Sequence, residues 1–290
     1  MSKEGIIGKP VIDELRICYI ADPLLLDDLS HVEVGKFREY APFTVYRVSG
    51  DRFEYTFSIC IGDVEARKEV GLFKYGRYGA EDSTFCYLKV VNSVLYDQKR
   101  LKQVLSFPTL LGLVFNNFTA IDIAIDHSKN ISSIIKRMMR NPEVDTILNG
   151  KKIQDRKKRI PGVTIDYSTS LNRLKCPTIT IRQAKAIKKK ENGITVQSYD
   201  KKAEVEGSEK KYILDYYNEP RYLFRLEVRL HYQELQDYCK KNNVIQCEEM
   251  LFDQETLKDM YYYHLSSVLR FSKGREKLAW QDIISCNGKV

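Results

Sequence analysis

The sequence lacks the features of a membrane-spanning, secreted or zinc-binding chain. No stretch of its 290 residues approaches the ~20 apolar residues that a spanning helix requires. The N-terminus has no basic region followed by a clean apolar run, as a signal peptide would. The seven cysteines are an odd number, with no CxxC spacing and no cysteine–histidine pairing typical of zinc ligands. We therefore expect reduced thiols, a cytoplasmic location and no membrane partner.

A glycine-rich phosphate loop and an internal repeat are also missing. The segment "GKPVIDE" near the N-terminus does not have the glycine spacing of such a loop. A chain of this length can bury about three quarters of its extended-chain surface, enough for one large domain or two modest ones.

Positive charge is gathered in two segments, one over 151–159 and one over 182–190. The chain has 47 lysine and arginine residues against 39 aspartate and glutamate residues, a net charge of +8. Basic side chains can contact phosphates and give salt-dependent nucleic-acid binding with little sequence information. A solvated loop is the alternative for the first segment. The candidate DNA contacts, with two strand arginines, are Lys151, Lys152, Arg156, Lys157, Lys158, Arg159, Arg182, Lys188, Lys189, Arg225 and Arg229.

The hydrophobic periodicity predicts an α+β fold. Strands and helices interleave unevenly, which favours a central, mostly antiparallel sheet with flanking helices and a helical C-terminal part over a doubly wound parallel sheet. Helical periodicity predicts helices after Tyr96, over 130–143, over 231–244 and over 253–274. Alternating residues predict strands over 52–63, 84–96, 118–127, 162–170 and 222–230, and around Tyr199.

The strand "AIDIAID" has two aspartates on one face. Side chains alternate across a strand, so Asp122 and Asp126 point away from the isoleucines between them. Two carboxylates on one polar face could flank a divalent cation, since hard cations take oxygen ligands. The alternative is a pair of solvated or lysine-paired aspartates.

Two later strands also carry a polar face. "YLFRLEVRL" places Arg225, Glu227 and Arg229 together, which indicates a polar cleft or a cross-strand salt network. In "ITVQSYDKK" the face with Tyr199 also carries Lys201, whereas Lys202 faces the other way if the strand stays regular. A strand tyrosine taken alone is more often a packing residue.

In this order, the segments "IDIAID", "SYDKKAE" and "YLFRLEVRLHYQEL" resemble the replication initiation factors of rolling-circle plasmids and the related gene II initiator-nickases of filamentous phages. The resemblance covers about residues 50 to 240, and its motifs are short. One departure is Ala120, where the family often has an arginine before "ID".

The resemblance implies that the protein nicks one DNA strand at an origin through a tyrosine that becomes joined to the 5′ phosphate. At the positions that match the family's motif, the resemblance implies that Tyr199 is the nucleophile and Lys202 its basic neighbour. A divalent metal, Mg²⁺ or Mn²⁺, is implied as well. Its candidate ligands are Asp122, Asp126, Glu204 and Glu227.

The chemistry agrees with this assignment. A phenol of pKa ~10 is a weak nucleophile at neutral pH, so it needs a nearby cation and a metal beside the phosphate. The phosphotyrosine bond keeps the energy of the broken phosphodiester, so rejoining needs no nucleotide. Many other rolling-circle nickases hold metal with a His-hydrophobic-His motif, but the four histidines of this chain are scattered.

We therefore expect a plasmid or phage replication initiator that binds single- and double-stranded origin DNA and leaves a free 3′ hydroxyl for a polymerase. A host helicase is a further expected partner, and the oligomeric state stays open. The alternatives are a non-catalytic initiator built from winged-helix domains, or a metal-dependent nuclease that uses water. The expected segments are an N-terminal one over 1–45, a catalytic nicking domain over 46–245 and a C-terminal helical one over 246–290.

Overall fold

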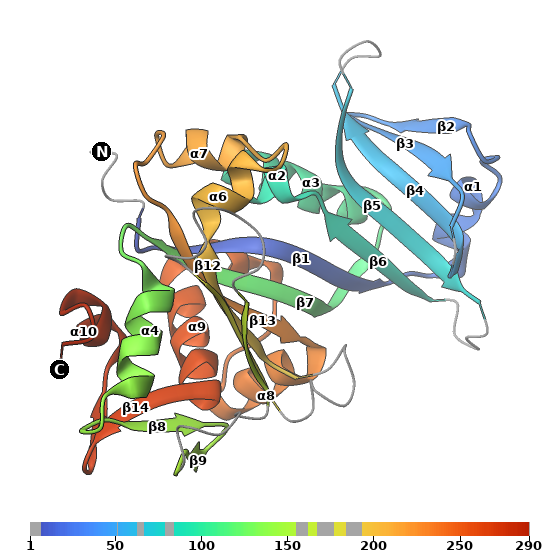
Figure 1. Cartoon of the computed structure of the whole chain (residues 1–290). Coiled ribbons are helices and arrows are strands. Elements are labelled where there is room, and N and C mark those ends of the chain that lie inside the picture. The colour runs from blue at the N-terminus through green and yellow to red at the C-terminus, as the bar shows by residue number, and fades with distance from the viewer. Residues whose placement is uncertain are drawn as a thin grey trace. The chain divides into compact units, whose positions relative to one another are not determined.

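The computed structural model of the protein describes residues 7–50, 52–62, 67–78, 84–154, 162–166, 177–183 and 193–289. The chain, traced in Figure 1, forms two compact units, each built from separated stretches of sequence. They therefore do not coincide with the three consecutive segments expected from the sequence. Unit 1 comprises Met1–Val11, Asp122–Asn242 and Asp253–Val290, and unit 2 comprises Ile12–Ile121 and Asn243–Phe252.

Unit 2 is built on antiparallel strands in the order β1-β6-β5-β4-β3-β2. Phe57 and Phe73 face each other in the β4–β5 register, and Phe107 contacts Phe73 edge-on, so the helix that carries Phe107 covers this face. The elements are β1 (Pro10–Ile20), η2 (Pro23–Leu26), α1 (Asp27–Ser30), β2 (Phe37–Tyr40), β3 (Phe43–Val48), β4 (Phe53–Ile61), β5 (Lys68–Arg77), β6 (Phe85–Val90), α2 (Asn92–Leu95), α3 (Gln98–Leu110) and η3 (Glu248–Phe252).

Unit 1 carries the motif strands. Its larger sheet has the order β10-β11-β12-β13-β7, so β13 lies between the tyrosine strand and the aspartate strand. The pairs β10–β11, β11–β12 and β12–β13 are antiparallel. The strands are β7 (Val114–His127), which begins in unit 2, β10 (Val163–Asp166), β11 (Thr178–Arg182), β12 (Thr195–Asp200) and β13 (Phe224–His231).

A second sheet of unit 1 has the order β15-β14-β8-β9. Its strands are β8 (Asp145–Leu148), β9 (Lys151–Lys152), β14 (Leu269–Lys273) and β15 (Glu276–Leu278). The helices of the unit are α4 (Ile131–Arg140), α6 (Lys201–Glu206), α7 (Tyr212–Tyr216), α8 (Tyr232–Asn242), α9 (Gln254–Val268) and α10 (Trp280–Ser285).

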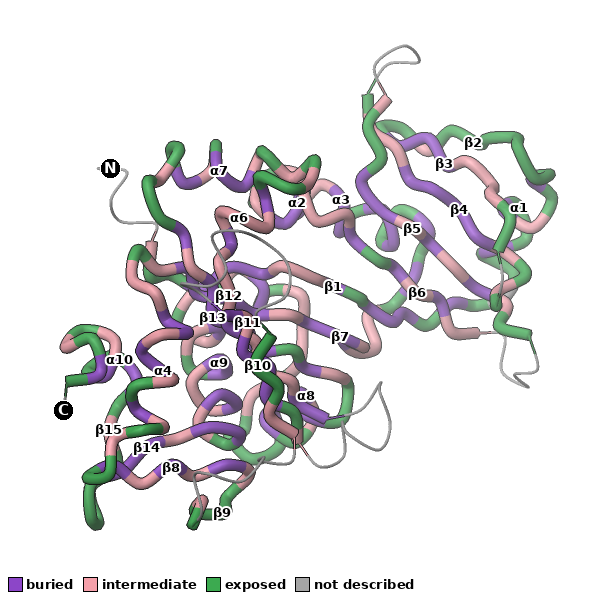
Figure 2. The backbone as a smooth tube through the Cα atoms, viewed as in Figure 1, coloured by how far each residue is buried: buried purple, intermediate pink, exposed green. Residues whose placement is uncertain are grey.

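One face of the larger sheet of unit 1 forms the core against α4 and α9. The Ser132 and Ser198 hydroxyls are 2.9 Å apart, which joins α4 to β12. The Tyr261 hydroxyl of α9 donates to the Leu226 carbonyl of β13 at 3.1 Å. Buried residues follow β12, β13 and α9 in Figure 2. The opposite face of the strands carries the charged side chains of the sequence motifs.

The α+β class with an antiparallel sheet is confirmed. The helix expected over 130–143 is α4, which Asn130 caps by accepting from the Ser133 amide at 2.9 Å. The helix expected over 253–274 ends earlier, because Leu269–Lys273 forms β14 and pairs with β8. Pairing to a neighbouring strand outweighed the local helical pattern there.

Within the described ranges, no helix is both long enough and apolar enough to cross a membrane.

Candidate functional site

Tyr199 lies near the end of β12, beside β13. In the antiparallel register Tyr199 is opposite Arg225, and Gln197 is opposite Glu227, so all four side chains share one face. The Tyr199 hydroxyl donates to Glu227 Oε2 at 3.0 Å. The bond is diagonal across the strand pair, and it holds the phenol against a carboxylate.

Glu227 is also the centre of a charge network. The Glu227 side chain is only 1% exposed, and its Oε1 accepts from Arg229 Nε at 2.6 Å. The same Nε lies 3.4 Å from Asp122 Oδ2 on β7. Desolvation disfavours the charged guanidinium, but the Glu227 and Asp122 carboxylates outweigh it and raise the pKa of Arg229. Two carboxylates of different strands therefore share one cation beside Tyr199.

Asp126 and Arg225 form a separate, buried ion pair. Arg225 donates from Nε to Asp126 Oδ1 at 2.7 Å and from NH2 to Oδ2 at 2.6 Å. Both side chains are 0% exposed. A phosphate cannot reach this guanidinium, which corrects the expectation that Arg225 contacts DNA. Both oxygens of Asp126 are engaged, so this carboxylate is not presented to a metal ion beside Tyr199.

The chain after Tyr199 turns directly into a helix. Asp200 caps α6 by accepting from the Ala203 amide at 3.0 Å, so the strand does not continue through the two lysines. Lys202, the sequence-based candidate, points its Nζ to the Pro220 carbonyl at 2.9 Å.

Lys201 is the lysine beside Tyr199. Its Nζ lies 5.7 Å from the centroid of the Tyr199 ring, and its side chain is 1% exposed. Glu204 Oε2 pairs with this ammonium at 2.7 Å, and Glu204 Oε1 lies 3.5 Å from Lys210 Nζ. The alternation of strand side chains already placed Lys201 on the face of Tyr199, but the family motif directed the choice to Lys202. Glu204 is therefore bound to lysines rather than to the Arg229 network.

The donor chemistry of Asp122 and Glu227 suits a hard cation. Among the described residues, no group of three or more histidine, cysteine, aspartate or glutamate side chains is placed to hold a metal ion. Mg²⁺, however, is commonly held by one or two carboxylates, with substrate phosphates and waters as its other ligands. Asp122 fits that pattern, whereas both oxygens of Glu227 are already engaged, one by the Tyr199 hydroxyl and the other by Arg229.

The residues predicted to contact DNA differ in whether the structure describes them and in how exposed they are. Lys151 and Lys152 form the exposed strand β9, although Lys152 Nζ pairs with Asp145 at 2.7 Å. Arg182 is exposed at the end of β11, and the Arg229 side chain is 45% exposed. The remaining candidates lie outside the described residues: Arg156, Lys157, Lys158, Arg159, Lys188 and Lys189.

The chain matches no protein-family model and no curated protein sequence. It is similar to a solved structure described as the rolling circle replication initiator protein from Geobacillus stearothermophilus. The TM-score is 0.51 at 13% sequence identity, and the match covers 97% of this chain and 95% of the other. At this identity the likeness shows a shared fold.

Proposed function

We propose that this protein initiates rolling-circle DNA replication by nicking one strand of an origin through Tyr199. The observation that carries the proposal is the hydrogen bond of 3.0 Å from the Tyr199 hydroxyl to Glu227. Glu227 is also bound to Arg229, which lies beside Asp122. The chain shares its fold with a rolling-circle initiator. We also propose that a plasmid or a phage encodes the protein.

The proposed step is a transesterification. The Tyr199 oxygen attacks the scissile phosphorus, the bond from phosphorus to the 3′ oxygen breaks, and a 5′-phosphotyrosine link and a free 3′ hydroxyl result. Glu227 Oε2 is placed to accept the phenol proton, and the departing 3′ oxygen takes a proton from the solvent. The reverse reaction rejoins the strand without a nucleotide.

Cations next to the phenol and the phosphate support this step. Lys201 lies beside the Tyr199 ring, where a positive charge favours the phenolate. The half-exposed Arg229 can reach a phosphate from the side of Glu227. Lys202 stays a sequence-based candidate, and its ammonium donates to the Pro220 carbonyl.

A divalent cation, Mg²⁺ or Mn²⁺, belongs to the proposal. Asp122 would hold it, and when bound it would neutralise charge on the phosphate oxygens. Asp126, Glu204 and Glu227 were further candidates from the sequence, but their carboxylates are bound to Arg225, Lys201 and Arg229.

Single- and double-stranded origin DNA would be the substrate, in the cytoplasm where such DNA is replicated. The free 3′ hydroxyl would be extended by a host polymerase, with a host helicase opening the duplex ahead of it. Both host proteins follow from the proposed reaction.

The test is cleavage of labelled single-stranded and supercoiled DNA that carries the replicon's own origin, in Mg²⁺ or Mn²⁺. Protein–DNA adducts are scored on a denaturing gel for the wild type, for Tyr199→Phe and for Tyr232→Phe. Tyr232 is a control because it is an exposed tyrosine of the same unit, at the start of α8. An adduct that disappears only in Tyr199→Phe supports the proposal.

Other outcomes select the alternatives. Cleavage without an adduct would identify a nuclease that uses water. Specific binding with no cleavage would identify a non-catalytic initiator, and an adduct that persists in Tyr199→Phe would overturn the choice of nucleophile.

A further inference from the structure

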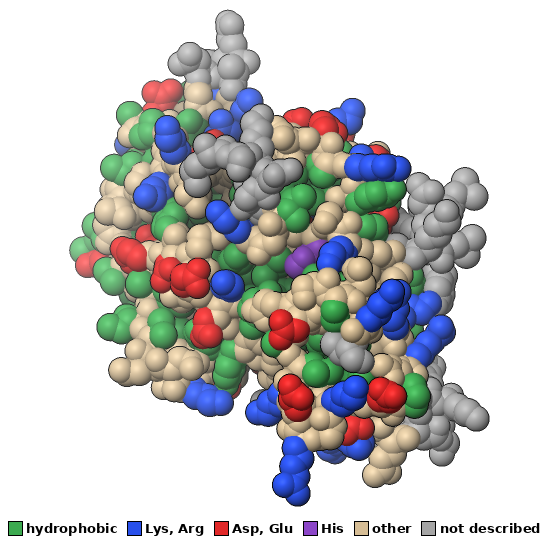
Figure 3. All heavy atoms as spheres, turned by 90° about the vertical axis from the view of Figure 1, so that its left-hand side faces the viewer, with side chains coloured by type: hydrophobic (Ala, Val, Ile, Leu, Met, Phe, Trp, Pro, Cys, Tyr) green, Lys and Arg blue, Asp and Glu red, His purple; other side chains and the backbone are tan. Residues whose placement is uncertain are grey.

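One face of the protein has locally mixed charge. On the face shown in Figure 3, lysine and arginine side chains lie among acidic and hydrophobic ones. A net charge of +8 therefore does not by itself say where an anionic partner would lie. A local group of basic side chains without acidic neighbours is more informative.

One pocket of unit 1 has such a lining. It lies between α4 and the turn that follows α10, with a volume of about 670 Å³. Four basic residues and no acidic residue line it. The polar and basic lining residues are Ser133, Lys136, Arg137, Arg140, Asn141 and Lys289.

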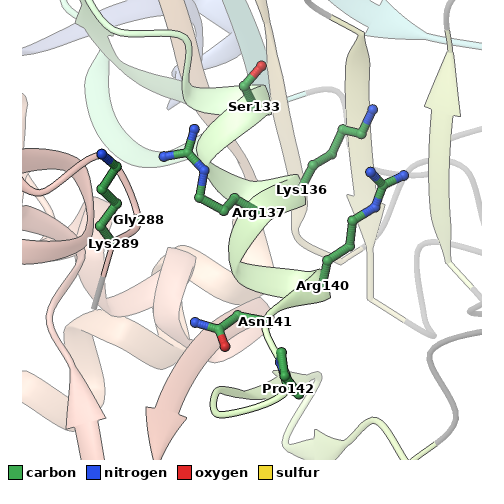
Figure 4. A pocket seen from close by; sticks show the side chains of 8 residues that line it. All are labelled: Ser133, Lys136, Arg137, Arg140, Asn141, Pro142, Gly288 and Lys289. Atoms are coloured by element: carbon green, nitrogen blue, oxygen red, sulfur yellow. The ribbon is translucent and has the colours of Figure 1, made fainter.

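The spacing of these residues on α4 explains the arrangement. Residues three and four positions apart share one side of a helix, so Lys136, Arg137 and Arg140 follow one stripe on the side away from the buried isoleucines. Figure 4 shows Lys136 and Arg140 directed to one side of α4. Arg137 is directed to the other side, where the segment with Gly288 and Lys289 lies.

The lining of this pocket contains basic side chains and no carboxylate. Arg140 and Lys289 are exposed and form no ion pair with any described residue. Arg137 donates to the backbone carbonyl of Asn287, which leaves its charge in place. The C-terminal end of α4 contributes about half a negative charge, which is smaller than the three full positive charges around it.

The wall that carries Lys289 is held firmly against α4. Gly288 has a φ of +68°, and a Cβ atom there would lie 3.3 Å from Ile134 Cγ2, so the turn packs closely on the helix. Lys129 Nζ donates to the carbonyls of Ile284 at 3.0 Å and Ser285 at 2.7 Å. The close packing of this turn on α4 therefore fixes the backbone of Lys289 relative to the backbone of the α4 arginines.

We propose that this pocket, named here the α4 groove, binds the sugar–phosphate backbone of duplex DNA that flanks the nick site. The inference rests on the proposed function. Long, exposed basic side chains with a serine and an asparagine beside them suit repeated phosphates, which need charge and hydrogen-bond donors but little shape selection. A small anionic ligand would need a more enclosed site, with buried polar groups directed at it.

The test compares Arg140→Gln/Lys289→Gln with a matched control, Lys36→Gln/Lys99→Gln. The control residues are exposed in unit 2 and form no ion pair with described residues, and both variants lose two positive charges. One probe is a single-stranded oligonucleotide that spans the nick site. The other carries the same site joined to a duplex flank. Binding is measured between about 50 and 200 mM salt.

For the groove variant, we expect the slope of log affinity against log salt on the duplex-flanked probe to fall by about 2, because each phosphate contact contributes about 0.9. Its affinity for this probe should fall about tenfold or more at low salt. Adduct formation on the single-stranded probe should stay at the wild-type rate. The control should retain both slope and affinity.

An unchanged slope in the groove variant would overturn the inference, and so would an equal loss in the control. Displacement of the duplex by millimolar inorganic phosphate or pyrophosphate, in the wild type only, would indicate a small-anion site instead. If the wild type forms no adduct on any probe, the proposed nicking function fails. In that case the salt dependence of duplex binding still tests the α4 groove, because it does not depend on adduct formation.

Discussion

The hydroxyl of Tyr199 donates a hydrogen bond of 3.0 Å to Oε2 of Glu227, across the strand pair β12–β13. Glu227 is almost fully buried, and its other oxygen is bound to Arg229, so its orientation is set before any DNA arrives. A nucleophile and a proton acceptor at this distance satisfy the geometric requirement for general-base assistance. The proposed chemistry depends on this pair.

Replacing Glu227 with glutamine should slow adduct formation by about 10²- to 10⁴-fold, because the amide cannot accept the phenol proton as a base. The rate is measured in a single turnover on single-stranded origin DNA. Glu206→Gln is the matched control, since the Glu206 side chain is 55% exposed on α6 and should react at the wild-type rate. Equal rates for the two variants would exclude Glu227 as the base.

Replacing Lys201 with methionine should lower the rate of adduct formation by about tenfold or more, because it removes a cation 5.7 Å from the Tyr199 ring. Lys202→Met should retain a rate within severalfold of the wild type, since its ammonium is bound to the Pro220 carbonyl. The two variants are compared at equal protein concentration after their folding is checked by circular dichroism. The reverse order of effects would restore Lys202 as the basic neighbour.

Replacing Arg225 with methionine should lower the free energy of unfolding by about 3–5 kcal/mol, because it leaves the Asp126 charge buried without its partner. Arg229→Met lies on the same strand face and leaves the buried Glu227 without its cation, but Arg229 itself is half-exposed, so the loss should be smaller than for Arg225→Met. Both values come from urea denaturation. Similar losses for the two variants would contradict a structural role specific to Arg225.

Nicking should show the opposite order for these two arginines. Arg229→Met should slow adduct formation under conditions where the protein is folded, since Arg229 joins Glu227 and Asp122. Arg225→Met, assayed at a temperature well below its unfolding transition, should retain more activity than Arg229→Met.

His264 should make the protein sensitive to acid. Burial lowers the pKa of His264 from 6.5 to about 4, although Asp237 acts in the opposite direction. Between these values the unfolded chain binds the proton and the folded chain does not. Stability should therefore be complete above about pH 6.5 and fall toward pH 4, by about 3 kcal/mol for this group.

The measurement is urea denaturation of the wild type at several pH values in that range. His264→Phe should lose part of this pH dependence, and the exposed His31→Phe should keep it. Identical profiles for all three proteins would show that His264 does not contribute.

Much of the fold could be predicted because side-chain periodicity reflects burial on a local element. The isoleucines of "AIDIAID" recur every second residue, and this segment lies in the strand β7. The isoleucines of "NISSIIKRMM" recur with a helical period of about 3.6, and this segment forms the helix α4. The prediction was wrong over Leu269–Lys273, where pairing with β8 makes a strand of an apparently helical segment. Which partner a segment meets is not encoded in its own pattern.

The candidate site was predictable as a set of residue types but not as a set of contacts. Asp122, Tyr199, Glu227 and Arg229 were selected from three separate strands, and the structure brings them together. The choice of Lys202 over Lys201 followed a motif, whereas the helix that Asp200 caps decides where each lysine points.

By itself, the sequence determined which segments form strands with one polar face, and that a tyrosine, carboxylates and arginines would occupy those faces, because alternation across a strand is a local property. Only the tertiary structure decided the pairing of the charges. The register of β12, β13 and β7 places Arg229 between Glu227 and Asp122, and buries Arg225 with Asp126. Two arginines four residues apart on one strand thereby differ in accessibility, because that depends on the residues of other strands and helices packed around each.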